Sequence, residues 1–229
     1  MIRAVIFDVG GPLDLENTFE AAIDVDIRDG LRREGFHFTE EDWDAANRNA
    51  ILTCAPSVYR SVIWTLTGGD LDASTRIYDW MEGRAHLRDL FELRPGVLQV
   101  LEALKQRGIK LGLCANQPAV VLRRLDRQGI GHYFSNDGIS GVLGLRKPDV
   151  RLFVRVCLDL GVDPAECIMV GDRIDNDVVP AKLLGMRTVL IRTGRHREQQ
   201  PRSWEEIPNF EVEDATGILR AVEKLLDSQ

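Results

Sequence analysis

The sequence predicts an α/β protein with a doubly wound parallel sheet and an inserted all-helical domain. Short apolar segments alternate with amphipathic stretches of helical length, which is typical of a parallel sheet with helices on both faces. Strand patterns vanish between residues 14 and 93, where charged helical patterns take over. Because a crossover between parallel strands needs only about a dozen residues or more, we expect this stretch to be a separate domain.

Five segments have the length and composition of strands. They are residues 3–7, 109–115, 167–170, 188–191 and 210–212. The first three are short, apolar runs, and this pattern favours buried strands. Together with the helical stretches between them, they predict a Rossmann-like sheet.

Helices are expected between these strands. Pro118 stands where a helix can open, since its missing N–H does no harm in the first turn. Asp149 can cap the next helix, Gly185 ends a later one, and the last spans residues 218–226. The stretch GISGVLG, residues 138–144, is predicted to be a loop with a hairpin rather than a phosphate-binding loop. The segment after Gly96 carries an apolar stripe with the i, i+3, i+4, i+7 spacing of an amphipathic helix, at Val97, Val100, Leu101 and Leu104.

The turn Arg94-Pro95-Gly96 ends the helical stretch. We therefore expect residues 1–13 and 94–229 to form the α/β core, and residues 14–93 to form a helical cap. Ligands of such sheets bind beyond the carboxyl ends of the strands. A domain inserted directly after the first strand is expected to lie over that edge as a lid.

Composition narrows the class of protein. The chain has 229 residues, 44% hydrophobic and 28% charged, with a formal net charge of −7, which suits a globular protein with one good core and a smaller domain. The acidic balance argues against non-specific binding to nucleic acid, which needs clustered Lys and Arg. No apolar run reaches the length of a membrane span, and the N-terminus lacks a signal-peptide pattern. The four cysteines are scattered without a CxxC pair, which favours reduced residues in a cytoplasmic protein.

Polar residues follow three of the predicted strands. Asp8, Asn116 and Asp172 stand at the carboxyl ends, Lys147 lies in the segment GLRKPD, and the turn DRIDND adds further acids. Because parallel strands end at one edge of a sheet, these groups are expected to meet as a carboxylate cluster beside a lysine. Carboxylates suit hard cations, above all Mg²⁺, which binds through one or two carboxylates together with a substrate phosphate.

The residue types suggest roles within this cluster. Asp8 can be a metal ligand or a nucleophile, and Lys147 can neutralise charge on a transferring group. Asn116 can hold phosphate together with the first N–H groups of the following helix, or it can be a simple turn residue. The acids of DRIDND can equally stabilise a helix N-terminus; we expect a metal role for Asp177 and a capping role for Asp175.

Four motifs in sequence order resemble those of the haloacid dehalogenase superfamily, in its phosphatase-like branch with a helical cap after the first motif. They are FDVGGPL, LGLCANQ, LRKPD and VGDRIDNDVVPAKLLGM. The resemblance implies that Asp8 is a nucleophile that forms an aspartyl-phosphate, and that Lys147 steadies both nucleophile and phosphate. It also implies a Mg²⁺ site made by Asp8, the carbonyl of Gly10 and Asp172, with Asp177 in support. The implied substrate is a small phosphorylated metabolite, turned over by a monomer or homodimer.

The chain departs from the family pattern at three positions. Gly10 replaces a second aspartate that protonates the leaving group, a function worth roughly 10²–10⁴-fold in rate. Glycine still offers the carbonyl that binds metal. Ala115 replaces a Ser or Thr whose hydroxyl contacts phosphate, and Pro12 replaces a threonine.

The missing acid leaves several hypotheses open. The substrate can carry a good leaving group, such as an acyl, aryl or anomeric phosphate. Alternatively, Asp14, Glu16 or a cap residue supplies the proton. The chain can also be a weak or inactive member that binds a phosphorylated ligand. A metal-independent 2-haloacid dehalogenase, which lacks the second aspartate too, is the remaining alternative, although the acidic GDRIDND loop favours a cation.

Overall fold

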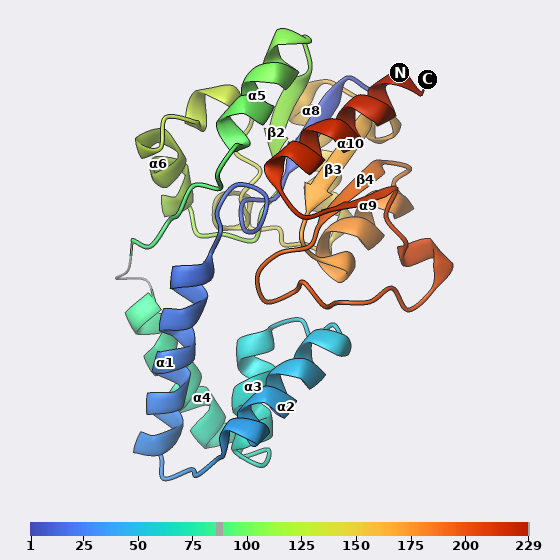
Figure 1. Cartoon of the computed structure of the whole chain (residues 1–229). Coiled ribbons are helices and arrows are strands. Elements are labelled where there is room, and N and C mark those ends of the chain that lie inside the picture. Colours follow the sequence, from blue (N-terminus) through green and yellow to red (C-terminus); the bar gives the residue numbers. More distant parts are fainter. Residues whose placement is uncertain (86–88, 229) are drawn as a thin grey trace. The chain divides into compact units, whose positions relative to one another are not determined.

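The computed structural model describes residues 1–85 and 89–228. The chain divides into two compact units: Met1–Leu15 together with Glu92–Gln229, and Glu16–Phe91 (Figure 1). The second unit is therefore two residues shorter at each end than the helical domain expected from the sequence. In the described residues no helix is long and apolar enough to cross a membrane.

A five-stranded parallel sheet forms the centre of the first unit, as the sequence predicts. Its order is β2-β1-β3-β4-β5 (Figure 1). The strands are β1 (Ala4–Phe7), β2 (Lys110–Leu113), β3 (Cys167–Gly171), β4 (Arg187–Ile191) and β5 (Phe210–Val212). The chain moves from β1 outward to β2 and then returns to β3 on the other side of β1. The pair β1 and β3 is thus the switch point of the sheet, where ligands of doubly wound folds bind.

Helices cover both faces of this sheet. Alternate residues of β1 and β3, such as Ile6 and Met169, pack in one apolar cluster with Phe153 and Val156 of α8. Helices α5 and α10 contact each other and lie on the other side of the strands (Figure 1). The helices of this unit are α5 (Val97–Gln106), α6 (Val120–Arg127), α7 (Ser140–Leu143), α8 (Val150–Leu160), α9 (Val179–Leu183) and α10 (Ala215–Asp227).

Local signals place the helix ends largely as predicted. The Asp149 side chain caps α8 by accepting from the N–H of Arg151 at 2.9 Å, and Gly185 adopts a left-handed φ of 79° after α9. The hairpin predicted within residues 138–144 is wrong. This segment forms the short helix α7, which ends at Gly144 with a left-handed φ of 68°. The Ser140 hydroxyl contacts the Gln117 carbonyl, so the turn is fixed by a segment that local pattern does not include.

The second unit consists of helices α1 (Asn17–Arg33), α2 (Glu40–Leu52), α3 (Val58–Leu66) and α4 (Leu71–Ala85). It has an apolar core of its own, in which Ile27, Trp43, Ile63 and Ile77 are buried. A capping box at Thr39 begins α2. This unit therefore has the core that a separate domain needs.

The two chain segments that lead into and out of the helical unit run side by side. Leu15 donates its N–H to the Glu92 carbonyl at 2.9 Å, and Arg94 donates to Leu13 at 2.8 Å. The Asp14 carboxylate also accepts from the N–H of Glu92 at 2.8 Å. The helical unit is thus inserted into the α/β unit at one hydrogen-bonded point.

Candidate active site

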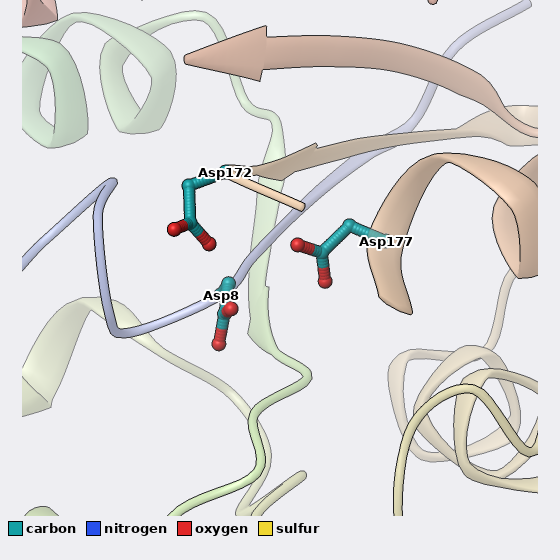
Figure 2. A group of neighbouring side chains, drawn as sticks. All are labelled: Asp8, Asp172 and Asp177. Carbon is teal, nitrogen blue, oxygen red and sulfur yellow. The ribbon is translucent and has the colours of Figure 1, made fainter. Parts of the chain in front are cut away.

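Three carboxylates meet at the switch point. Asp8 directly follows β1, Asp172 directly follows β3, and Asp177 lies in a π-helical turn, Ile174–Val178. Each offers an oxygen, and these oxygens all lie within 4.8 Å of one another (Figure 2). Hard divalent cations prefer such oxygen ligands, so the donor set fits Mg²⁺.

The Lys147 ammonium completes the cluster. Its Nζ lies 2.8 Å from Asp8 Oδ2 and 2.6 Å from Asp177 Oδ1, and its side chain is 1% exposed. Burial opposes a charge on Lys147, but the two carboxylates more than compensate and raise its pKa above the usual value. Burial raises the pKa of Asp177 to about 6, against the lowering effect of Lys147. The lysine is therefore a fixed cation beside Asp8.

Glycines allow the three carboxylates to approach so closely. Gly11 has a φ of 80°, and a Cβ there would lie 2.6 Å from Asp172 Cβ. At Gly171 a Cβ would lie 2.3 Å from Asp177 Cγ. A side chain at either position would displace an acid of the cluster, so the backbone itself forms part of the wall.

In the turn after Asp8, the carbonyl of Gly10 has no hydrogen-bond donor among the described residues. Val9 accepts from the N–H groups of both Leu13 and Asp14, and Gly11 donates to Asp14. The Gly11 carbonyl accepts from the Arg94 side chain. Among the described residues, none donates a hydrogen bond to the carbonyl of Gly10. This is the carbonyl that the sequence resemblance implies as a metal ligand, and the turn keeps it available.

Asn116 and Ala115 occupy the end of β2. The Asn116 amide binds the backbone of Lys147 on both sides: its Nδ2 donates to the Lys147 carbonyl at 2.9 Å, and its Oδ1 accepts from the Lys147 N–H at 2.8 Å. Ala115 is fully buried and pairs with Ile139. Asn116 therefore positions the lysine loop, a contact that its strand-end location alone did not indicate.

Asp175 lies in the first turn of the segment Ile174–Val178, where a negative charge suits a helix N-terminus, and its side chain bonds to two other side chains. Arg173 contacts both of its oxygens, the closer at 2.5 Å, and Gln199 Nε2 donates to it at 2.7 Å. Gln199 also accepts from the N–H of Ile174 at 2.6 Å. These bonds attach the turn that contains Asp177 to the loop after β4. Neither Arg173 nor Gln199 is among the site residues predicted from the sequence. Gln199 lies 25 residues from Ile174, so no local pattern indicates that contact.

Two further predictions concern buried groups. Cys114 is fully buried, and burial raises the pKa of its thiol, which fits packing rather than nucleophilic chemistry. Asp14, one candidate proton donor, is buried in the linker, where it accepts from Glu92. This contact gives Asp14 a structural role in the linker.

A parallel sheet covered by helices, with a lysine-bridged carboxylate cluster at its switch point, is the arrangement of a hydrolase-like α/β protein. Comparison with known proteins identifies the family. The model of the haloacid dehalogenase-like hydrolases matches residues 2–185, so the chain belongs to this family. It is 37% identical over 132 residues to glyceraldehyde 3-phosphate phosphatase of Methanopyrus kandleri, and the aligned region covers 57% of each chain. It is 35% identical over 135 residues to phosphoserine phosphatase of Thermus thermophilus, over 58% of this chain and 53% of the relative.

A solved structure resembles the chain over nearly its whole length. The crystal structure of a HAD phosphatase from Thermococcus onnurineus has a TM-score of 0.64 and 25% identity, and the match covers 98% of both chains. The curated relatives are matched over little more than half of their length. The family model already spans parts of both units, and the structural match covers nearly all of the chain.

Proposed function

We propose that this chain is a Mg²⁺-dependent phosphatase of small phosphorylated metabolites, acting through Asp8. The observation that carries the proposal is the Lys147 ammonium held between Asp8 and Asp177, 2.8 Å and 2.6 Å away, in a cluster of three carboxylates. The named phosphatase relatives support the same reaction class.

The metal would be held by Asp8, the Gly10 carbonyl and Asp172, with Asp177 in support. When bound, it would offset negative charge on the phosphoryl group. Lys147 is buried and cationic and lies 2.8 Å from Asp8, so it can stabilise charge on the phosphoryl oxygens. Asn116 keeps the lysine in place through two backbone hydrogen bonds.

The reaction would proceed in two displacements. An Asp8 carboxylate oxygen attacks phosphorus, the bond from phosphorus to the ester oxygen breaks, and the leaving group departs with the bonding electron pair. Water then hydrolyses the aspartyl-phosphate to inorganic phosphate and free Asp8. Gly10 cannot donate a proton to the leaving group, so the geometry favours substrates whose leaving group is already stable as an anion.

A transient-kinetic experiment tests this proposal. The protein is mixed rapidly with p-nitrophenyl phosphate and Mg²⁺, and the phenolate is followed, with Asp8→Asn as the control. We expect a burst of about one equivalent, because the aryl leaving group needs little protonation. A slow steady state should follow, and the Asp8→Asn variant should show neither phase. Equal phenolate release by both proteins would contradict the role of Asp8.

A second candidate function is a metal-independent dehalogenase. The observation in its favour is the absence of an acid at Gly10, since displacement of halide needs no proton. The clustering of three carboxylates within 4.8 Å argues against it, because one lysine ammonium offsets only part of their negative charge and a divalent cation would offset the rest. Halide release from 2-haloacids that persists in excess chelator would favour this candidate over the phosphatase.

A further inference from the structure

Arg94 is a buried cation at the point where the chain returns from the helical unit. The residue is 6% exposed. Burial lowers the pKa of its guanidinium from the usual value, while the charges of Asp172, Asp14 and Asp214 act in the opposite direction. Within the described part of the chain it forms no ion pair. A buried charge is costly unless hydrogen bonds satisfy it, so its contacts call for an explanation.

Those contacts are with two neutral oxygens at the carboxyl edge of the sheet. Arg94 Nε donates to the carbonyl of Gly11, and a terminal nitrogen donates to the Thr193 hydroxyl at 2.8 Å. Gly11 lies in the turn after β1, and Thr193 lies in the loop after β4. One guanidinium therefore joins three segments that are distant in sequence.

The turn that Arg94 holds is the one on which the proposed metal site depends. Gly11 follows Gly10, whose carbonyl has no hydrogen-bond partner among the described residues. On its other side Gly11 packs against Asp172, where a Cβ added to Gly11 would lie 2.6 Å from the Asp172 Cβ. Arg94 fixes the Gly11–Pro12 peptide, while the neighbouring peptide that carries the Gly10 carbonyl is held by the bond from the Gly11 N–H to the Asp14 carbonyl. Arg94 therefore limits the path of the turn on which the Gly10 carbonyl and the place of Asp172 depend.

We propose that Arg94 is a positioning residue for the divalent metal site: it holds the Gly10–Gly11 turn against Asp172 by binding the Gly11 carbonyl and the Thr193 hydroxyl. The inference rests on the proposed function for its metal site, and it adds a residue outside the four family motifs. Groups that orient metal ligands typically contribute 10- to 100-fold in affinity.

Titration of the metal-free protein with Mg²⁺ by isothermal calorimetry tests the proposal. We expect Arg94→Gln to bind Mg²⁺ about 10- to 100-fold more weakly than the wild type, and excess Mg²⁺ to restore its phenolate burst. Thr193→Val, which removes one acceptor, should weaken binding in the same direction. The control is Arg107→Gln, which removes a surface ion pair with Glu223 in the same unit and should leave Mg²⁺ affinity unchanged.

Thermal unfolding without Mg²⁺ separates positioning from folding. A folded Arg94→Gln with wild-type Mg²⁺ affinity would overturn the proposal, and if that variant fails to fold, unchanged affinity in Thr193→Val would do so. Wild-type protein that binds no Mg²⁺ would overturn the metal site and this role together. Wild-type protein that binds Mg²⁺ but releases no phenolate would contradict the phosphatase alone, and the affinity of the Arg94→Gln variant would still decide the role of Arg94.

Discussion

Two adjacent glycines in the turn after β1 serve different ends. Gly11 needs its left-handed φ of 80° and the space that Asp172 occupies, so no other residue fits there without strain. Gly10 does not adopt a positive φ, and its backbone conformation therefore admits a side chain. The absence of a carboxylate at Gly10 is consequently a matter of chemistry rather than of backbone geometry.

Restoring the carboxylate should raise turnover of alkyl phosphates. We expect Gly10→Asp to accelerate hydrolysis of a simple alkyl phosphate by roughly 10²-fold, because a positioned acid contributes about 10²–10⁴-fold. The gain for p-nitrophenyl phosphate should be smaller in the burst phase, since its leaving group needs little protonation. Steady-state phosphate release measures both. Gly10→Asn, which has the same size without the acid, is the matched control, and an equal gain in that variant would rule out proton donation.

His196 predicts a pH dependence of stability. Its Nδ1 is buried without a hydrogen-bond partner among the described residues, and burial together with Arg173 lowers its pKa from 6.5 to about 3. Arg195 also lowers it, and Asp175 partly offsets the effect. Below pH 6.5, His196 binds a proton in the unfolded chain but not in the folded chain. The free energy of unfolding therefore falls as the pH drops towards 3.

Urea unfolding between pH 7 and pH 4.5 measures this effect. The contribution of His196 has a slope of at most about 1.4 kcal/mol per pH unit, and His196→Asn should remove it, which flattens the profile relative to the wild type. His132→Asn, which changes an exposed histidine, should keep the wild-type slope. An unchanged profile in His196→Asn would show that other groups govern acid stability.

At the scale of elements, the loop before α8 is held by the end of β2. Asn116 clamps both backbone groups of Lys147. Asn136 makes the same kind of clamp on Leu113, accepting from its N–H at 2.8 Å and donating to its carbonyl at 3.1 Å. Both side-chain amides thus bind the N–H and the carbonyl of one residue, but only Asn116 binds the segment that contains Lys147.

Variants of Asn116 and Asn136 distinguish an effect on stability from an effect on catalysis. Asn116→Ala should lower the rate of the phenolate burst because Lys147 loses its support, and it should cost about 1–3 kcal/mol of stability because two backbone groups lose their partner. Asn136→Ala should cost a similar amount of stability and leave the burst rate unchanged. Stopped-flow kinetics and denaturant unfolding measure the two quantities. A burst rate equally reduced in both variants would mean that general loosening, not the lysine loop, is responsible.

The same elements show how far sequence patterns reach. That Asp8 and Asp172 meet follows from their places at strand ends, because parallel strands end at one edge. Lys147 lies in the loop before α8, so strand ends alone do not place it. The contacts of Asn116 and Arg94 could not be predicted, since an amide or guanidinium at a strand end or turn has several partners within reach. Which partner it takes depends on the path of loops elsewhere in the chain. The helix α7 was missed for the same reason, since a distant segment fixes it.

On the scale of the whole molecule, the insertion leaves the α/β unit intact. The flanking residues Leu15 and Glu92 are joined by a 2.9 Å hydrogen bond, and the helical unit keeps its own apolar core. Termini that lie close together are typical of domains that tolerate insertion.

Deleting the helical unit should therefore preserve the core. We expect a chain in which a short Gly/Ser linker replaces residues 16–91 to unfold cooperatively and to bind Mg²⁺ as the intact protein does. Because the cap is expected to select the substrate, discrimination among phosphorylated metabolites should decline. Circular dichroism, calorimetry and a substrate panel measure these outcomes. An aggregated or non-cooperative product would show that the α/β unit depends on the insertion.

The central place of β1 has a consequence for synthesis on the ribosome. Ala4 pairs with Lys110 on one side and with Cys167 on the other, so β1 has both of its neighbours only after β3 has been made. At a synthesis rate of about 5–20 residues per second, roughly 5–20 s pass before β2 follows β1 out of the ribosome. The helical unit is complete before then and can fold first. Meanwhile the apolar strand Ala4–Phe7 lacks both of its partner strands on the nascent chain, a situation that favours aggregation during folding.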